Sequence, residues 1–124
     1  AAGASQKDLM AEVRDVAGMK VLSARVDVPD RATLGSMAEK YRDRLRGVGA
    51  LASVIEDKVV MIVAVSKDLT PKVHAGKIVQ ALSERVGGKG GGRPDFAQGG
   101  GTEAAKIDEA MKTIDDIITG NTKS

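Results

Sequence analysis

The chain has 124 residues, a length that predicts one domain with its own hydrophobic core. It contains no cysteine, which excludes disulfides, cysteine-based zinc sites and thiol nucleophiles, and its only aromatic residues, Tyr41 and Phe96, disfavour a protein interface built on aromatic hot spots. The formal net charge is +2, and the longest apolar run, residues 59–65, is too short to cross a membrane.

The first part of the chain predicts a strand followed by a helix. We interpret residues 1–16 as a linker or the end of a preceding helix, and the start without methionine or signal peptide leads us to expect a piece of a longer protein. Residues 20–28 alternate in polarity, which predicts a half-buried strand ended by Pro29. Asp30 is a good N-cap for a helix that continues to about Arg46. The residues of its expected core stripe are Leu34, Met37, Tyr41 and Leu45. The glycines expected to end it are Gly47 and Gly49.

The middle of the chain predicts a β-hairpin and a second helix. Residues 50–55 and 59–65 are expected to pair across a tight turn at Asp57 and Lys58. The second of these strands is apolar at every position, which predicts a central strand covered on both faces. After a loop over residues 66–71, a helix is expected over residues 72–86. Its core stripe consists of Ala75, Val79, Leu82 and Val86. His74, the only histidine, is interpreted as a surface or capping residue.

A last helix is expected after the glycine-rich residues 87–101, with Thr102 as N-cap and Gly120 at its end. Its core stripe consists of Ile107, Met111, Ile114 and Ile118. The order β-α-β-β-α-loop-α predicts a small α/β sandwich with a mixed sheet of three or four strands, in which residues 95–98 are candidates for a short edge strand. We place the domain at residues 17–120, followed by a tail at 121–124.

Residues 87–101 read GGKGGGRPDFAQGGG and contain eight of the 15 glycines. A P-loop is excluded because no Gly-Lys-Ser/Thr follows and a helix precedes the run, and the register does not fit a dinucleotide-binding fingerprint. The run is therefore interpreted as a loop that presents backbone amides, Lys89 and Arg93 to a nucleic-acid backbone, with a flexible linker as the alternative. Phe96 either stacks on a base or anchors the loop to the core.

Charge patterning adds further candidate contacts. Residues 30–46 carry five basic and three acidic side chains, residues 67–93 carry six and two, and residues 103–116 carry two and five. A basic middle before an acidic stretch favours an anionic partner on one face, although each basic residue alone is also explained by a solvated helix surface. The candidates for contact with a nucleic acid are Lys40, Arg42, Arg44, Arg46, Lys77 and Arg85, together with Lys89, Gly90, Gly91, Gly92, Arg93, Phe96 and Gln98 of the glycine run.

The glycine run and the segments Ser-Lys-Asp-Leu at residues 66–69 and Ala-Gly-Lys-Ile-Val at residues 75–79 resemble the C-terminal domain of alanyl-tRNA synthetases. This DHHA1-type domain is shared with DHH phosphoesterases, and the resemblance covers residues 18–118. It implies a non-catalytic cytoplasmic module that binds the outer corner of tRNA-Ala and brings together the aminoacylation and editing modules. The implied partners are tRNA, the other domains of the synthetase and a possible second copy of the chain. No cofactor is implied here, and ATP, Mg and Zn would bind elsewhere in the parent enzyme.

Two alternatives stay open. In DHH phosphoesterases the related loop is of the Gly-Gly-His type and helps to bind substrate, and Arg93 stands about where that histidine would be. The metal-holding domain of those enzymes has no counterpart in this sequence, which disfavours an independent phosphoesterase. The second alternative is a purely structural module for inter-domain contact or dimerisation, in which the glycine run packs against sister domains and contacts no RNA.

Overall fold

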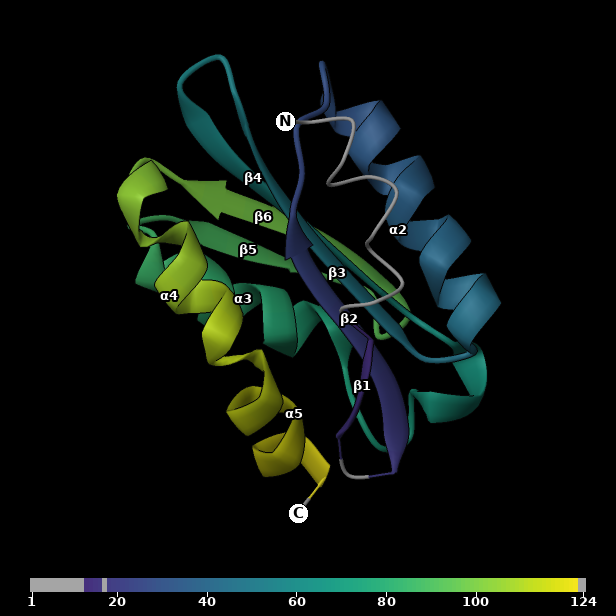
Figure 1. Ribbon diagram of the computed structural model, residues 1–124. Coiled ribbons are helices and arrows are strands. Elements are labelled where there is room, and N and C mark those ends of the chain that lie inside the picture. The colour runs from purple at the N-terminus through teal and green to yellow at the C-terminus, as the bar shows by residue number, and fades with distance from the viewer. Residues whose placement is uncertain (1–12, 17, 123–124) are drawn as a thin grey trace.

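The computed structural model describes residues 13–16 and 18–122. One six-stranded sheet with the strand order β1-β2-β3-β4-β6-β5 forms the middle layer of the molecule (Figure 1). Only β2 and β3 are parallel, because the helix between them crosses over one face of the sheet. The strands are β1 (Arg14–Val16), β2 (Met19–Arg25), β3 (Val48–Ile55), β4 (Lys58–Val65), β5 (Lys89–Gly92) and β6 (Phe96–Gly101).

Helices cover both faces of the sheet. Helix α2 (Arg31–Leu45) lies on one face, and α3 (Ala75–Arg85), α4 (Ile107–Lys112) and α5 (Ile114–Thr122) lie on the other (Figure 1). Short 3-10 helices, η2 (Lys67–Leu69) and η3 (Ala104–Lys106), join the larger elements. The predicted α/β class is confirmed, whereas the sheet has six strands in place of the three or four expected.

Strand β1 accounts for one of the additional strands. Residues 14–16, interpreted from the sequence as linker or helix end, pair antiparallel with β2, Val16 opposite Met19. The remainder of that interpretation, residues 1–12, lies outside the described residues. The half-buried strand predicted for residues 20–28 is confirmed in its second half, where Val26 is buried on the α2 side and Arg25 is exposed. Only the start of β2 is covered on both faces. Val21 packs on the α3–α4–α5 side and Leu22 on the α2 side, and both are fully buried.

Helix α2 begins and ends about where predicted, but a different residue terminates it. The backbone N–H of Thr33 donates to Oδ1 of Asp30 at 2.8 Å, which confirms Asp30 as the N-cap. At the other end Arg46, not Gly47, adopts the left-handed conformation, with φ of 52°. Gly47 is needed for another reason: a Cβ there would lie 2.1 Å from the carbonyl oxygen of Lys20 on β2.

The central hairpin is confirmed. Strand β4 lies between β3 and β6, and its residues alternate between the cores on the two sides of the sheet. The tight turn falls one residue earlier than predicted, on Glu56 and Asp57, which both have positive φ. Its place is set by the pairing of Ile55 with Lys58, which makes Lys58 the first residue of β4.

The later helices differ from the predicted helices in their bounds. Helix α3 starts at Ala75, and Nδ1 of His74 accepts the backbone N–H of Lys77 at 3.3 Å, which confirms the capping interpretation of that histidine. The last predicted helix is divided at Thr113 into α4 and α5. Its expected stripe is buried throughout, but Thr102 does not cap it and Gly120 lies within α5.

Candidate nucleic-acid interface

The glycine run forms the β5–β6 hairpin at one edge of the sheet. Strand β6 pairs with both β4 and β5, with Gly91 of β5 opposite Gln98 of β6. The expectation of an open loop that presents many amides is therefore wrong, because β6 lies between two strands and its backbone belongs to the hydrogen-bonded ladder. Within the hairpin, the outer side of β5 is the one side that has no strand partner among residues 13–16 and 18–122.

One face of this hairpin packs directly on α3. A Cβ built on Gly90 or Gly99 would lie 2.7 or 2.3 Å from Oγ of Ser83. A Cβ on Gly76 of α3 would likewise lie 2.8 Å from the carbonyl oxygen of Gly92. These glycines allow helix and hairpin backbones to approach more closely than side chains would permit. Their role is structural.

The opposite face of the hairpin is open. A Cβ on Gly91 would meet no atom within 4 Å, and the side chains of Lys89 and Gln98 are exposed. Helix α2 packs mainly on β2, β3 and β4 and does not extend over the far edge of the sheet (Figure 1). The far edge therefore keeps an uncovered surface of glycine backbone and polar side chains.

A groove of about 450 Å³ lies at the base of the hairpin; we call it the glycine groove. Its cations are Arg31 at the start of α2, Lys58 at the start of β4 and Lys89 at the start of β5, and no acidic side chain lines it. Within the described part of the chain these three side chains form no salt bridge. The other lining residues are Val59, Val60, Gly87, Gly88, Gln98, Gly99, Gly100, Gly101 and Thr102. Three unpaired cations beside bare backbone suit a phosphate backbone.

A shallower hollow of about 390 Å³ adjoins the glycine groove; we call it the Phe96 niche. Phe96 is half-buried against the core on the α2 side, and a Cβ on Gly35 would lie 3.6 Å from its Cζ. Phe96 thus anchors the hairpin to α2, the second of the two predicted roles, and still lines a hollow. The lining residues are Arg31, Ala32, Gly35, Ser36, Glu39, Ile62, Phe96 and Gln98, of which Arg31 and Gln98 also line the glycine groove.

Two other predicted residues, Arg93 and Lys77, lie at the turn of the hairpin and at the start of α3 beside it. Nε of Arg93 lies 3.8 Å from Oδ1 of Asp95, and the arginine side chain is 74% exposed. The backbone N–H of Ala75 donates to the carbonyl oxygen of Pro94 at 2.8 Å, which holds this turn beside the start of α3, where Lys77 lies. Arg93 and Lys77 are therefore at the end of the hairpin opposite to the glycine groove.

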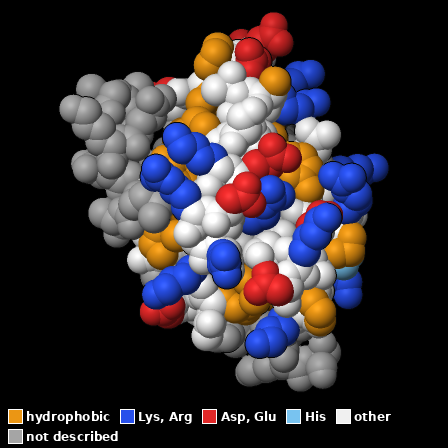
Figure 2. All heavy atoms as spheres, turned by 90° about the vertical axis from the view of Figure 1, so that its right-hand side faces the viewer, with side chains coloured by type: hydrophobic (Ala, Val, Ile, Leu, Met, Phe, Trp, Pro, Cys, Tyr) orange, Lys and Arg blue, Asp and Glu red, His pale blue; other side chains and the backbone are white. Residues whose placement is uncertain are grey.

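The remaining predicted cations are not gathered at the groove. Lys40, Arg42, Arg44 and Arg46 lie in the second half of α2 and at its C-cap, away from Arg31 at its start. Arg42 is ion-paired with Asp43 at 2.9 Å. On the side of the molecule that α2 covers, Lys and Arg side chains are interspersed with Asp and Glu (Figure 2). Arg85 lines a different hollow that also contains Glu84, Glu103 and Glu109.

Arg31 and Lys58 are candidate residues that the sequence analysis missed. Lys58 was predicted as a turn residue, and Arg31 entered the sequence analysis only in the charge count of residues 30–46. Their proximity to Lys89 depends on the pairing of β4 with β6 and of β6 with β5. The signal that could have revealed Lys58 is a pairing of the apolar strand 59–65 with the second glycine triplet.

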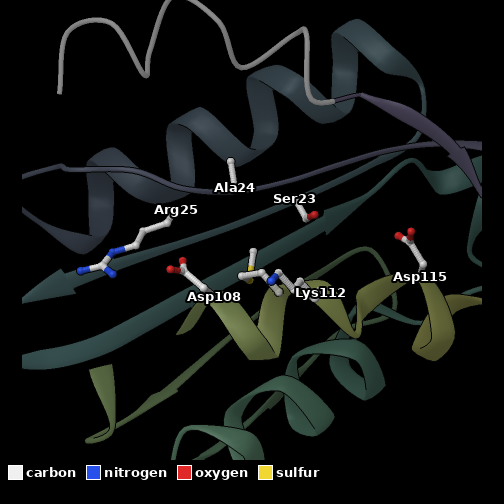
Figure 3. A pocket seen from close by; sticks show the side chains of 7 residues that line it. Ser23, Ala24, Arg25, Asp108, Lys112 and Asp115 are labelled. Atoms are coloured by element: carbon white, nitrogen blue, oxygen red, sulfur yellow. The ribbon is translucent and has the colours of Figure 1, made fainter. Parts of the chain in front are cut away.

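A further hollow, of about 550 Å³, lies between β2 and the α4–α5 segment. Arg25 and Lys112 line it together with Asp108 and Asp115 (Figure 3). Equal numbers of basic and acidic side chains give no preference for a polyanion. Among the described residues, no group of three or more His, Asp or Glu side chains could hold a metal ion, and no helix is long and apolar enough to span a membrane.

Comparison with known proteins gives a consistent result. The DHHA1 domain family matches residues 18–120. The alanine–tRNA ligase of Pseudomonas fluorescens is 47% identical over 112 residues, which are 90% of this chain and 13% of that protein. The chain therefore spans about an eighth of the length of this curated relative. A RecJ structure from Thermus thermophilus shares the fold, with a TM-score of 0.55 and 14% identity. That match covers 79% of this chain and 14% of the RecJ chain.

The crystal structure of the C-Ala domain of Aquifex aeolicus alanyl-tRNA synthetase has a TM-score of 0.80 and 30% identity. The match covers 87% of this chain and 98% of that one. As expected, the chain corresponds to a non-catalytic accessory domain. The chain belongs to the DHHA1 domain family, in the form found as the C-Ala domain of alanyl-tRNA synthetase.

Proposed function

We propose that this domain binds tRNA as part of a cytoplasmic alanyl-tRNA synthetase. The observation that carries the proposal is the glycine groove, where Arg31, Lys58 and Lys89 surround glycine backbone and no acidic side chain is among the lining residues. The proposed contact is the outer corner of tRNA-Ala, and its proposed consequence is to link the aminoacylation and editing modules. The groove residues require no cofactor for this role, so ATP, Mg²⁺ and Zn²⁺ would be bound by other parts of the enzyme.

The physical basis is recognition of the phosphate backbone. Lysine and arginine side chains that neutralise phosphates release condensed counterions, which makes affinity depend steeply on salt. Glycine residues leave the protein backbone unshielded, so that a sugar–phosphate chain can approach it closely. The spread of the cations over three elements favours recognition of RNA shape in preference to base sequence. Arg93 and Lys77, at the other end of the hairpin, would extend the contact along the RNA.

The test compares two RNAs at several salt concentrations. We expect this domain to bind full-length tRNA-Ala with a steep salt dependence and to bind weakly to an acceptor-stem minihelix that lacks the corner. Equal binding to both RNAs would contradict corner recognition and indicate a non-specific basic surface. Absence of binding to either would favour the structural alternative, in which this domain contacts sister domains or a second copy of the chain.

A further inference from the structure

We propose that the Phe96 niche binds one nucleobase, stacked against the ring of Phe96. The inference rests on the proposed function, since the base would belong to an RNA whose phosphates occupy the adjoining glycine groove. The inference extends the proposed function because it assigns base binding to a second hollow, separate from the glycine groove and lined by Gly35, Ile62 and Phe96. Base–aromatic stacking tolerates any sequence, because every base has a π-face.

Gly35 leaves space beside the ring of Phe96. It lies in the interior of α2, where glycine is less stable than alanine because it loses more conformational freedom on folding. An alanine Cβ at this position would make ordinary contacts, 3.5 Å from Cδ1 of Ile62 and 3.6 Å from Cζ of Phe96. The fold therefore does not require glycine here. What glycine provides is room beside the half-buried ring.

The side chains around the niche suit a base attached to a phosphate. Arg31 and Gln98 line both hollows, so a base in the niche and a phosphate in the groove would share them. The Gln98 amide can donate to and accept from a base edge. Glu39, on the niche side only, disfavours a phosphate there and can accept a hydrogen bond from a base amino group. Charge therefore directs the phosphate to the groove and the base to the niche.

The test uses the fact that Phe96 is the only phenylalanine in the chain. Its ring protons form one spin system in a proton NMR spectrum, and the buried Tyr41 provides an internal control. We expect the four nucleoside 5′-monophosphates to shift the Phe96 ring protons upfield, and ribose 5-phosphate to leave them unchanged. Absence of a shift with all four nucleotides, or the same shift with ribose 5-phosphate, would contradict base binding in the niche.

Substitutions at two positions, Gly35 and Phe96, distinguish the contribution of the niche from that of the groove. Gly35→Ala should raise Tm yet reduce the nucleotide-induced shift, because its methyl group occupies the niche; an undiminished shift would contradict the proposal. Phe96→Leu should lower tRNA affinity about tenfold without altering the salt slope, whereas Phe96→Tyr should retain affinity. If tRNA binding depends on Lys58 and Lys89 but Phe96→Leu does not change tRNA affinity, base binding in the niche is contradicted and the tRNA-binding function stands. If nucleotides shift Phe96 but tRNA does not bind, the tRNA-binding function fails instead.

Discussion

The two faces of the β5–β6 hairpin use glycine for opposite purposes. On the face toward α3, the absence of a Cβ on Gly90 and Gly99 allows the helix to pack against the strands. On the other face, the space at Gly91 is open and cations stand nearby. A glycine-rich run in a sequence is thus not by itself a binding loop. Here the closed face fixes the hairpin, and only the open face remains available to a ligand.

The difference arises from the extent of the helical layers. Helix α3 packs on β4, β5 and β6, so the core on its side extends to the edge of the sheet. Helix α2 packs mainly on β2, β3 and β4, and Phe96 marks the limit of the core on its side. The proposed binding surface therefore lies where one helical layer is narrower than the sheet that it covers.

The largest expected effect tests the closed face. Gly99→Ala should destabilise the domain by about 3 kcal/mol, because its Cβ would lie 2.3 Å from Oγ of Ser83 and 2.7 Å from Cα of Gly90. Gly91→Ala is the matched control and should change stability by no more than about 0.5 kcal/mol. Urea denaturation of both variants measures the contrast. Equal stability of the two variants would contradict the division of the hairpin into a closed and an open face.

The next effect tests the open face. Lys58→Ala and Lys89→Ala should each weaken tRNA binding several-fold and reduce the slope of log affinity against log salt by about one, while leaving unfolding unchanged. Lys112→Ala, in the mixed-charge hollow beside β2, is the control and should have no effect on either quantity. If the salt slope stays at the wild-type value in both lysine variants, the glycine groove is excluded as the RNA-binding site.

A smaller effect separates two predicted arginines. Arg93→Ala should reduce tRNA affinity less than either lysine variant, because the side chain is exposed but lies at the far end of the hairpin and near Asp95. Arg85→Ala should leave affinity unchanged, because Arg85 lies among Glu84, Glu103 and Glu109. Filter binding of both variants at low salt gives the comparison. A larger loss for Arg85 than for Arg93 would place the RNA on the α3–α4 side.

The smallest effect concerns the start of α2, which positions Arg31. Two hydrogen bonds lower the pKa of the Asp30 carboxyl below its ordinary value of 3.8. The larger effect comes from the Thr33 backbone N–H and the smaller one from the Thr33 side chain. This stabilisation is present above the ordinary pKa and is lost as pH falls through the lowered one. Asp30→Ala should slightly reduce Tm at pH 7, and the difference from wild type should vanish in acid. A difference that is constant with pH would show that the carboxylate charge has no part in it.

Local patterns in the sequence determined most of the elements. The Asp30 cap, the apolar strand 59–65 and the apolar stripes of the helices depend on local sequence alone, and each is present in the structure. Met37 and Leu45 of the first stripe are half-buried. The resemblance carried by residues 87–101 likewise identified the family correctly. Spacing could not reveal β1, because three residues without clear alternation become a strand only by pairing with β2.

The sequence by itself therefore determined the fold class, the family and the cores of the principal helices. The tertiary structure decided which side of the glycine run packs and which side is open, because the pairing of β6 with β4 and the packing of α3 depend on contacts distant in sequence. The same contacts bring Arg31, Lys58 and Lys89 to one groove and leave Lys40, Arg44 and Arg85 elsewhere. Charge patterning along a chain cannot make that selection, since it contains no information on which strands become neighbours.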